Sequence, residues 1–147
     1  MDFKIQWFPG HMTKAKRMME QQLKLVDVVV EMLDARVPRS STNPMLNQLL
    51  GQKPKIIALN KVDMADPAKT EAWKEIFKNN GLPVCVIDCN TGKGVKQLVA
   101  AVQKAAQPVI DKWLKRGVKN RSIRVMIVGI PNVGKSTLRY MLVGKNK

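Results

Sequence analysis

The sequence is poor in cysteine and histidine and contains no long hydrophobic run. Its two cysteines, Cys85 and Cys89, fall in a segment expected to be extended, where a rise of about 3.3 Å per residue places them roughly 13 Å apart and excludes a disulfide. The single histidine, His11, adds too few ligands for a metal site. Apolar runs such as 125–128 are far too short to span a bilayer, and the basic N-terminus leads into a polar segment. These features predict a cytoplasmic protein with reduced thiols and no signal peptide.

Acidic residues are also scarce, which gives the chain a strong positive charge. The 147 residues include 26 Lys and Arg against 11 Asp and Glu, a formal net charge of +15. The excess is uneven, because eleven basic residues and a single acid, Asp111, occupy the stretch from Lys104 onward. Such an excess favours a polyanionic partner bound through phosphate contacts, with nucleic acid ahead of a solvated basic surface that has no dedicated partner.

Apolar, strand-like runs alternate with amphipathic, helix-like segments along the chain. Each expected strand is a nearly continuous apolar run, as in a strand covered on both faces. The alternation predicts an α/β fold with a mostly parallel sheet and helices on both faces. Pro108 is expected to break or kink a long helix, with a final segment to Arg116. Residues 2–10 are expected to be extended, with strands at 26–33, 55–59, 83–87 and 123–128, and helices at 13–25, 44–50, 67–79, 95–106 and 135–143.

A glycine-rich segment after the last expected strand carries the strongest chemical signal. Residues 129–136 fit the pattern G-x-x-x-x-G-K-[ST], with an apolar strand before it and a helix after it. The glycines let successive backbone N–H groups point at phosphate oxygens, at the N-terminus of the following helix. Lys135 would neutralise the outer phosphates, and the Ser136 hydroxyl would ligate Mg²⁺. The alternative, a glycine-rich turn with a surface lysine, explains the full pattern less well.

A second motif, Asn60-Lys61-Val62-Asp63, stands at the tip of the strand expected at 55–59. The Asp63 carboxylate is suited to accept the N1–H and exocyclic amine donors of guanine, a pair that adenine lacks. Lys61 would lie along the base, and Asn60 would brace the loop. Alone, the motif is equally well explained as a polar turn. Beside a phosphate loop it predicts GTP or GDP and disfavours an ATPase or kinase, and Asp88-Cys89-Asn90 at the next strand tip would present a backbone amide to the guanine carbonyl.

The order of these motifs is reversed relative to an ordinary GTPase, in which the phosphate loop comes first. With this order, the chain resembles the circularly permuted GTPases of the ribosome biogenesis GTPase A (YlqF-type) family over essentially its whole length. The resemblance implies a P-loop GTPase fold in permuted order, GTP or GDP and Mg²⁺ as ligands, and a role in maturing the large ribosomal subunit precursor. The residues that carry it are Trp7-Phe8-Pro9-Gly10-His11-Met12, Asp34-Ala35-Arg36-Val37-Pro38, Asn43-Pro44, Asn60-Lys61-Val62-Asp63 and Gly129-Ile130-Pro131-Asn132-Val133-Gly134-Lys135-Ser136-Thr137.

In that family the phosphate loop is followed by two switch segments and a helical RNA-binding domain, which these 147 residues do not include. The resemblance therefore implies an incomplete G domain: 1–25 as an N-terminal extension and basic helix, 26–117 as the guanine-binding half, and 118–147 as linker, phosphate-loop strand and helix. We expect this chain to be a monomer that binds GDP weakly at best and does not turn over GTP. Without the switch-side strands, strand 123–128 is expected to be an exposed, association-prone edge.

The resemblance also assigns roles to single residues. His11 is either a water-orienting catalytic group, as the family implies, or a structural residue packed beside Trp7 and Phe8. Asn132 resembles the asparagine of potassium-stimulated GTPases, so K⁺ is a candidate ligand in the longer protein; alternatively it bonds its own backbone. The family usually has a small Ser-type residue where Cys89 stands. Nucleotide contacts are expected from Asn60, Lys61, Asp63, Asp88, Cys89, Asn132, Val133, Gly134, Lys135, Ser136 and Thr137.

A competing function is a basic, non-enzymatic module that binds rRNA. In either function the phosphate contacts of the RNA are expected from basic residues in two separate stretches of the chain, and the predicted set is Lys14, Arg17, Lys115, Arg116, Lys119 and Arg121.

Overall fold

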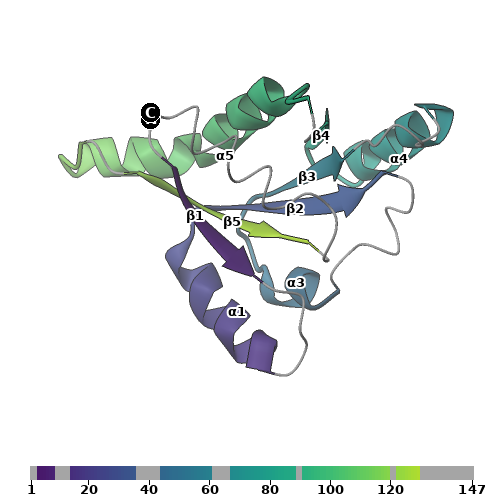
Figure 1. The fold of residues 1–147 in the computed structure, drawn as a ribbon. Coiled ribbons are helices and arrows are strands. Elements are labelled where there is room, and N and C mark those ends of the chain that lie inside the picture. The colour runs from purple at the N-terminus through teal and green to yellow at the C-terminus, as the bar shows by residue number, and fades with distance from the viewer. Residues whose placement is uncertain are drawn as a thin grey trace.

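Five parallel strands form a single sheet with helices on both faces (Figure 1). The structure, a computed structural model, describes residues 3–8, 14–35, 44–60, 67–88, 91–119 and 122–129. The strand order is β1-β5-β2-β3-β4, so the predicted α/β fold is confirmed. The strands are β1 (Phe3–Phe8), β2 (Val28–Asp34), β3 (Lys55–Asn60), β4 (Val84–Ile87) and β5 (Ile123–Val128), and the helices are α1 (Lys14–Leu25), α3 (Pro44–Leu49), α4 (Pro67–Asn79) and α5 (Val95–Lys115).

The two faces of the sheet pack against different helices because side chains alternate along each strand. In β2, Val28 and Val30 belong to the core cluster beneath α5, together with Leu98 and Val102 of that helix. On the opposite face, Val29 packs with α1 and α3, and the α4 side chains contact the same face of β2 and β3. Figure 1 shows α1 and α5 on opposite sides of the sheet. All seven residues of β2 and all six of β3 are buried, which explains why most of their residues are apolar.

The expected exposed edge at 123–128 is wrong, because β1 pairs with β5 along its whole length. The register runs from Phe3 opposite Ile123 to Phe8 opposite Val128, and β2 pairs with the other side of β5. The physical reason is that the edge of an apolar strand offers unpaired backbone groups. The aromatic and β-branched segment Phe3–Phe8 has high strand propensity and supplies partners for them. The N-terminal segment is thus part of the sheet, and the predicted four-stranded half-sheet has a fifth strand.

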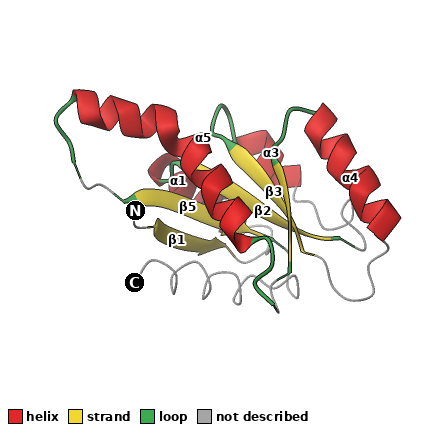
Figure 2. Cartoon of the chain, turned by 90° about the horizontal axis from the view of Figure 1, so that it is seen from above, coloured by secondary structure: helices red, strands yellow, loops and turns green. Residues whose placement is uncertain are grey.

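The predicted helices within the described residues are confirmed, with two differences, and the helix predicted at 135–143 lies outside those residues. Met19 and Leu23 of α1 are buried as expected. The helix containing Pro108 continues unbroken from Val95 to Lys115, and in Figure 2 it bends part-way along its length, as an internal proline favours. In α4, Trp73 and Phe77 pack on the core, whereas Ile76, which has the same apolar character and lies within one turn of both, is 46% exposed. Among the helices that the structure describes, none has both the length and the apolar character to cross a bilayer.

Candidate guanine-nucleotide site

The predicted nucleotide motifs follow strands that all end at one edge of the sheet, here called the carboxyl edge. Asn60 ends β3 and lies in register with Asp34, the last residue of β2, and with Ile87, the last residue of β4. On the other side of β2, Val128 ends β5 opposite Glu31 and leads into the phosphate loop. Neighbouring strands are about 4.8 Å apart, so the end of β5 is two strand spacings from Asn60 and three from the loop after β4. The carboxyl edge of a parallel sheet is where such folds bind ligands.

Asn60 is held firmly at this edge. The residue is 7% exposed, and its carbonyl oxygen accepts a hydrogen bond from the Ala35 amide at 3.0 Å. This bond extends the pairing of β2 and β3 past the end of both strands. The start of the base-reading motif is therefore fixed relative to the β2 terminus, which fits the bracing role expected of Asn60.

The loop after β4 is closed by its own hydrogen bonds. The Asp88 amide donates to the Lys93 carbonyl at 2.8 Å, and the Gly92 amide donates to the Asp88 carbonyl at 2.8 Å. The Asp88 carboxylate accepts a hydrogen bond from the Thr91 amide at 3.3 Å, and the Thr91 hydroxyl accepts one from the Lys93 amide at 3.3 Å. The Asp88 side chain therefore braces the loop, which is consistent with recognition of a base by backbone groups.

Gly94, which sequence reasoning missed, sets the close approach of this loop to β4. It is the N-cap of α5 and has φ +85°, a left-handed conformation that side chains disfavour. A Cβ atom here would lie 2.2 Å from the Val86 carbonyl oxygen. Only glycine fits this position without a backbone shift. The available signal was its place two residues after Gly92, directly before an amphipathic helix.

A buried polar network beneath α3 was also missed. Lys55, at the start of β3, donates a hydrogen bond from Nζ to Glu31 Oε1 at 3.0 Å, and the two side chains are 5% and 1% exposed. The same Nζ donates to Asn47 Oδ1 of α3. Lys55 therefore ties β3 to β2 and to the short helix that lies over them. Nothing in the sequence around Glu31 or Lys55 indicates that these two charged strand residues pair with each other.

Apart from Asn60 and Asp88, all of the predicted nucleotide contacts lie outside the described residues, and their roles stay predictions. Within the described ranges, no group of three or more His, Cys, Asp or Glu side chains is placed to hold a metal ion. Cys85, a free thiol in β4, is half-buried, and burial raises its pKa, with an opposing, smaller effect from Lys74. The predicted site residues that fall outside are His11, Lys61, Asp63, Cys89, Asn132, Val133, Gly134, Lys135, Ser136 and Thr137.

The predicted RNA contacts do not gather on one surface. Lys14 and Arg17 belong to the first turns of α1, whereas Lys115 and Arg116 lie at the end of α5, on the opposite face of the sheet. Arg17, Lys115, Arg116 and Lys119 are exposed. Both helices begin near the carboxyl edge and end near the opposite edge, so the two groups lie at diagonally opposed parts of the described structure (Figure 1). The sixth residue, Arg121, falls outside the described residues.

Comparisons with known proteins extend the motif-based resemblance to the whole chain. No family model matches it. It is 51% identical to ribosome biogenesis GTPase A of Priestia megaterium over 142 residues, which cover 96% of this chain and 49% of that protein. It is also 38% identical to the mouse mitochondrial ribosome-associated GTPase 1 over 133 residues, covering 90% of the chain and 40% of the relative.

A solved structure is similar to this chain in both sequence and fold. The GNP-bound YlqF of T. maritima superimposes with a TM-score of 0.66 at 38% identity, covering 90% of this chain and 49% of that one, and a GDP-bound YlqF structure matches with a TM-score of 0.64. The chain spans about half the length of the curated relatives it matches. Sequence and fold thus confirm the resemblance predicted from the motifs: the chain is homologous to ribosome biogenesis GTPase A (YlqF-type) proteins over about half of their length.

Proposed function

We propose that this chain is the guanine-nucleotide-binding half of a GTPase that acts in maturation of the large ribosomal subunit. The observation that carries the proposal is the carboxyl edge, where Asn60, Asp88 and the end of β5 come together although their motifs are widely separated in the sequence. The relatives' names support GTP and the ribosome as ligand and partner.

The base would be read by the segment that Asn60 begins. Asp63 would accept the two guanine donors, Lys61 would lie against the base, and the loop from Asp88 through Cys89 would offer a backbone amide to the guanine carbonyl. The self-bonded loop at Asp88 supports this role, because a preorganised loop loses little entropy when a ligand binds.

The phosphates would be bound by the loop that follows β5. The backbone N–H groups of Asn132, Val133 and Gly134 would point at phosphate oxygens, Lys135 would neutralise charge, and Ser136 and Thr137 would add hydroxyl contacts. Mg²⁺ keeps waters and substrate phosphates as ligands and needs few protein groups, which suits a site with Ser136 as its protein ligand. When bound, it would neutralise charge on the phosphates.

We further propose that hydrolysis needs parts of the longer relatives, so that these 147 residues bind nucleotide without turnover. The test is titration of a fluorescent GDP analogue with the native chain, followed by competition with unlabelled GDP and ADP. We expect competition by GDP but not ADP, loss of binding in Lys135→Ala, and no phosphate release from GTP. Equal competition by ADP would overturn the guanine assignment, and sustained, Lys135-dependent GTP hydrolysis would overturn the claim of no turnover.

A second candidate, a non-enzymatic rRNA-binding module, is favoured by the net charge of +15. In this function the phosphate loop would be incidental. Two results together would favour this function over the leading proposal: the native chain shows no affinity for GDP, and the Lys135→Ala variant still binds RNA. GDP binding with the expected specificity would rule out a purely RNA-binding role.

A further inference from the structure

The segment made of α5 and the four residues after it has more basic residues than any other helical segment that the structure describes. From Val95 to Lys119 this segment has six basic residues, all exposed, and one acid, Asp111. The Asp111 carboxylate accepts a hydrogen bond from Gln107 Nε2 at 2.8 Å. By comparison, α4 carries three lysines and two glutamates. The six residues, here called the α5 basic face, are Lys96, Lys104, Lys112, Lys115, Arg116 and Lys119.

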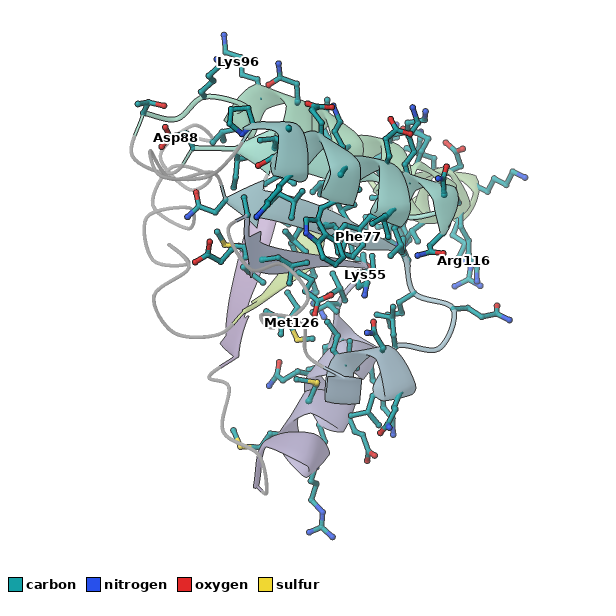
Figure 3. The ribbon with its side chains drawn as sticks, turned by 90° about the vertical axis from the view of Figure 1, so that its right-hand side faces the viewer. Lys55, Phe77, Asp88, Lys96, Arg116 and Met126 are labelled. Atoms are coloured by element: carbon teal, nitrogen blue, oxygen red, sulfur yellow. The ribbon has the colours of Figure 1, made fainter. Side chains whose placement is uncertain are left out.

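The basic side chains of this segment face solvent because the opposite side of the helix is anchored to the sheet. Leu98, Val102, Ala106 and Trp113 are buried against the strands, so the intervening basic side chains are held toward solvent. Lys96 and Lys115 are 19 positions apart, about 29 Å along a helix. Figure 3 shows Lys96 and Arg116 at opposite ends of α5, with Lys96 near Asp88 at the carboxyl edge.

The sheet separates this face from the other basic helix. Met19 and Leu23 anchor α1 to the side of the sheet that α5 does not touch, so Arg17 points away from the α5 layer. A single straight nucleic-acid segment cannot contact both helices without passing around the sheet. The predicted RNA contacts therefore divide into two groups, and the α5 group is the one that further exposed lysines extend.

The chemistry of the α5 basic face favours phosphates over bases. Recognition of unpaired bases uses exposed aromatic side chains on which bases stack. In the described α5 segment the one aromatic residue, Trp113, is 8% exposed. Lysine and arginine side chains instead bind phosphates, which a double-helical RNA presents along its whole length.

We propose that the α5 basic face binds the sugar–phosphate backbone of a double-helical RNA stem. This inference rests on the proposed association with ribosomal RNA, and it adds Lys96, Lys104 and Lys112 to the contacts predicted from the sequence while removing Lys14 and Arg17 from this surface. Because the contacts are to the backbone, binding depends on helical shape and salt and only weakly on base sequence.

The test compares two sets of four charge removals in the 147-residue chain. The first replaces Lys104, Lys112, Lys115 and Lys119 with glutamine, which has a similar helix propensity. The control replaces four basic residues of α1 in the same way: Lys14, Lys16, Arg17 and Lys24. Fluorescence anisotropy measures binding of a labelled RNA duplex of about 16 base pairs, and of its single strand, between about 50 and 200 mM salt. Circular dichroism and urea unfolding check that each variant is folded.

We expect the native chain to bind the duplex more tightly than the single strand. The α5 variant should bind the duplex at least about tenfold more weakly than the native chain, and the magnitude of its slope of log K against log salt should be smaller by about 3 to 4. The α1 control should bind within about twofold of native. A loss in the α1 control equal to that in the α5 variant would overturn the assignment. So would tighter binding of the single strand, or no duplex binding by the native chain, which would leave the basic face for an acidic protein. GDP affinity, measured on the same samples, tests the proposed nucleotide site separately.

Discussion

Replacing Lys55 with methionine tests the buried ion pair beneath α3. The Lys55 Nζ and Glu31 Oε1 atoms are 3.0 Å apart, and both side chains are almost fully buried. Methionine keeps most of the apolar volume of lysine but leaves the Glu31 carboxylate without its cationic partner. Breaking a buried pair from one side costs about 3 to 5 kcal/mol, because the remaining charge stays desolvated. The Asn47 amide oxygen also loses its donor.

The expected loss is at the lower end, about 3 kcal/mol, because Glu31 has a further interaction besides this one. With a urea m-value of about 2 kcal/mol/M, this lowers the midpoint of unfolding by about 1.5 M. Urea titration followed by circular dichroism and tryptophan fluorescence measures the shift. Coincident curves from the two probes would establish that a single transition is compared.

The double variant Glu31→Leu, Lys55→Met is the matched control. With both charges gone, no unpaired charge is left in the core, and the apolar pair should restore most of the lost midpoint, although Asn47 Oδ1 still lacks its donor. The sign of the second substitution is the critical result: Glu31→Leu should stabilise the Lys55→Met chain. If Lys55→Met lies within about 0.3 M of native, or if the double variant is no more stable than the single one, the ion pair is not the buried, coupled interaction described above.

Three further predictions concern the carboxyl edge and β4. Gly94→Ala should lower stability by about 2 kcal/mol or more and weaken GDP binding, because its Cβ would meet the Val86 carbonyl oxygen. Gly81→Ala is the control: with φ +79° and no atom within 4 Å of the added Cβ, it should cost only about 1 kcal/mol of backbone strain. Equal losses of stability in urea titration would contradict the contact with Val86. Asp63→Asn should shift the binding preference from GDP toward xanthosine diphosphate, because the asparagine amide can donate to the xanthine carbonyl that stands where guanine has its amine. An unchanged preference for GDP in a competition assay would rule out Asp63 as the residue that reads the base. Burial raises the pKa of Cys85, so the folded state favours the neutral thiol and stability should fall as pH rises beyond about 8.5. Iodoacetamide should therefore modify Cys85 more slowly in the folded than in the urea-unfolded chain at about pH 8. Equal rates, measured by peptide mass spectrometry, would contradict this.

The parts of the fold that sequence reasoning predicted well are those with strong local signals. β2, β3 and β5 are nearly continuous apolar runs, and such runs are typical of strands covered on both faces. α4 was predicted with the bounds that the structure gives it, because Pro67 starts it and Gly81 follows it. Boundaries set by proline and glycine depend on neighbouring residues alone, which is why they can be read from one sequence.

The parts that were missed depend on pairing between distant segments. β1 alternates apolar and polar residues, and its partner β5 lies more than a hundred residues further along the chain, so nothing near Phe3–Phe8 signals the pairing. The buried position of Lys55 similarly arises only from the register of β3 against β2. Ile76 fits the apolar periodicity of α4, but Trp73 and Phe77 make that helix's contact with the sheet, and Ile76 is left exposed.

The reversed order of the nucleotide motifs has a physical explanation in this architecture. A site at the carboxyl edge requires only that each motif follow a strand of the same parallel sheet, because all parallel strands end at the same edge. The base-reading segment follows β3 and the phosphate loop follows β5, with β2 between them in the sheet. The order in which the chain visits the strands affects the connecting helices but not the edge at which the motifs emerge. A permuted chain therefore brings Asn60, Asp88 and Gly129 to one edge as readily as an ordinary one.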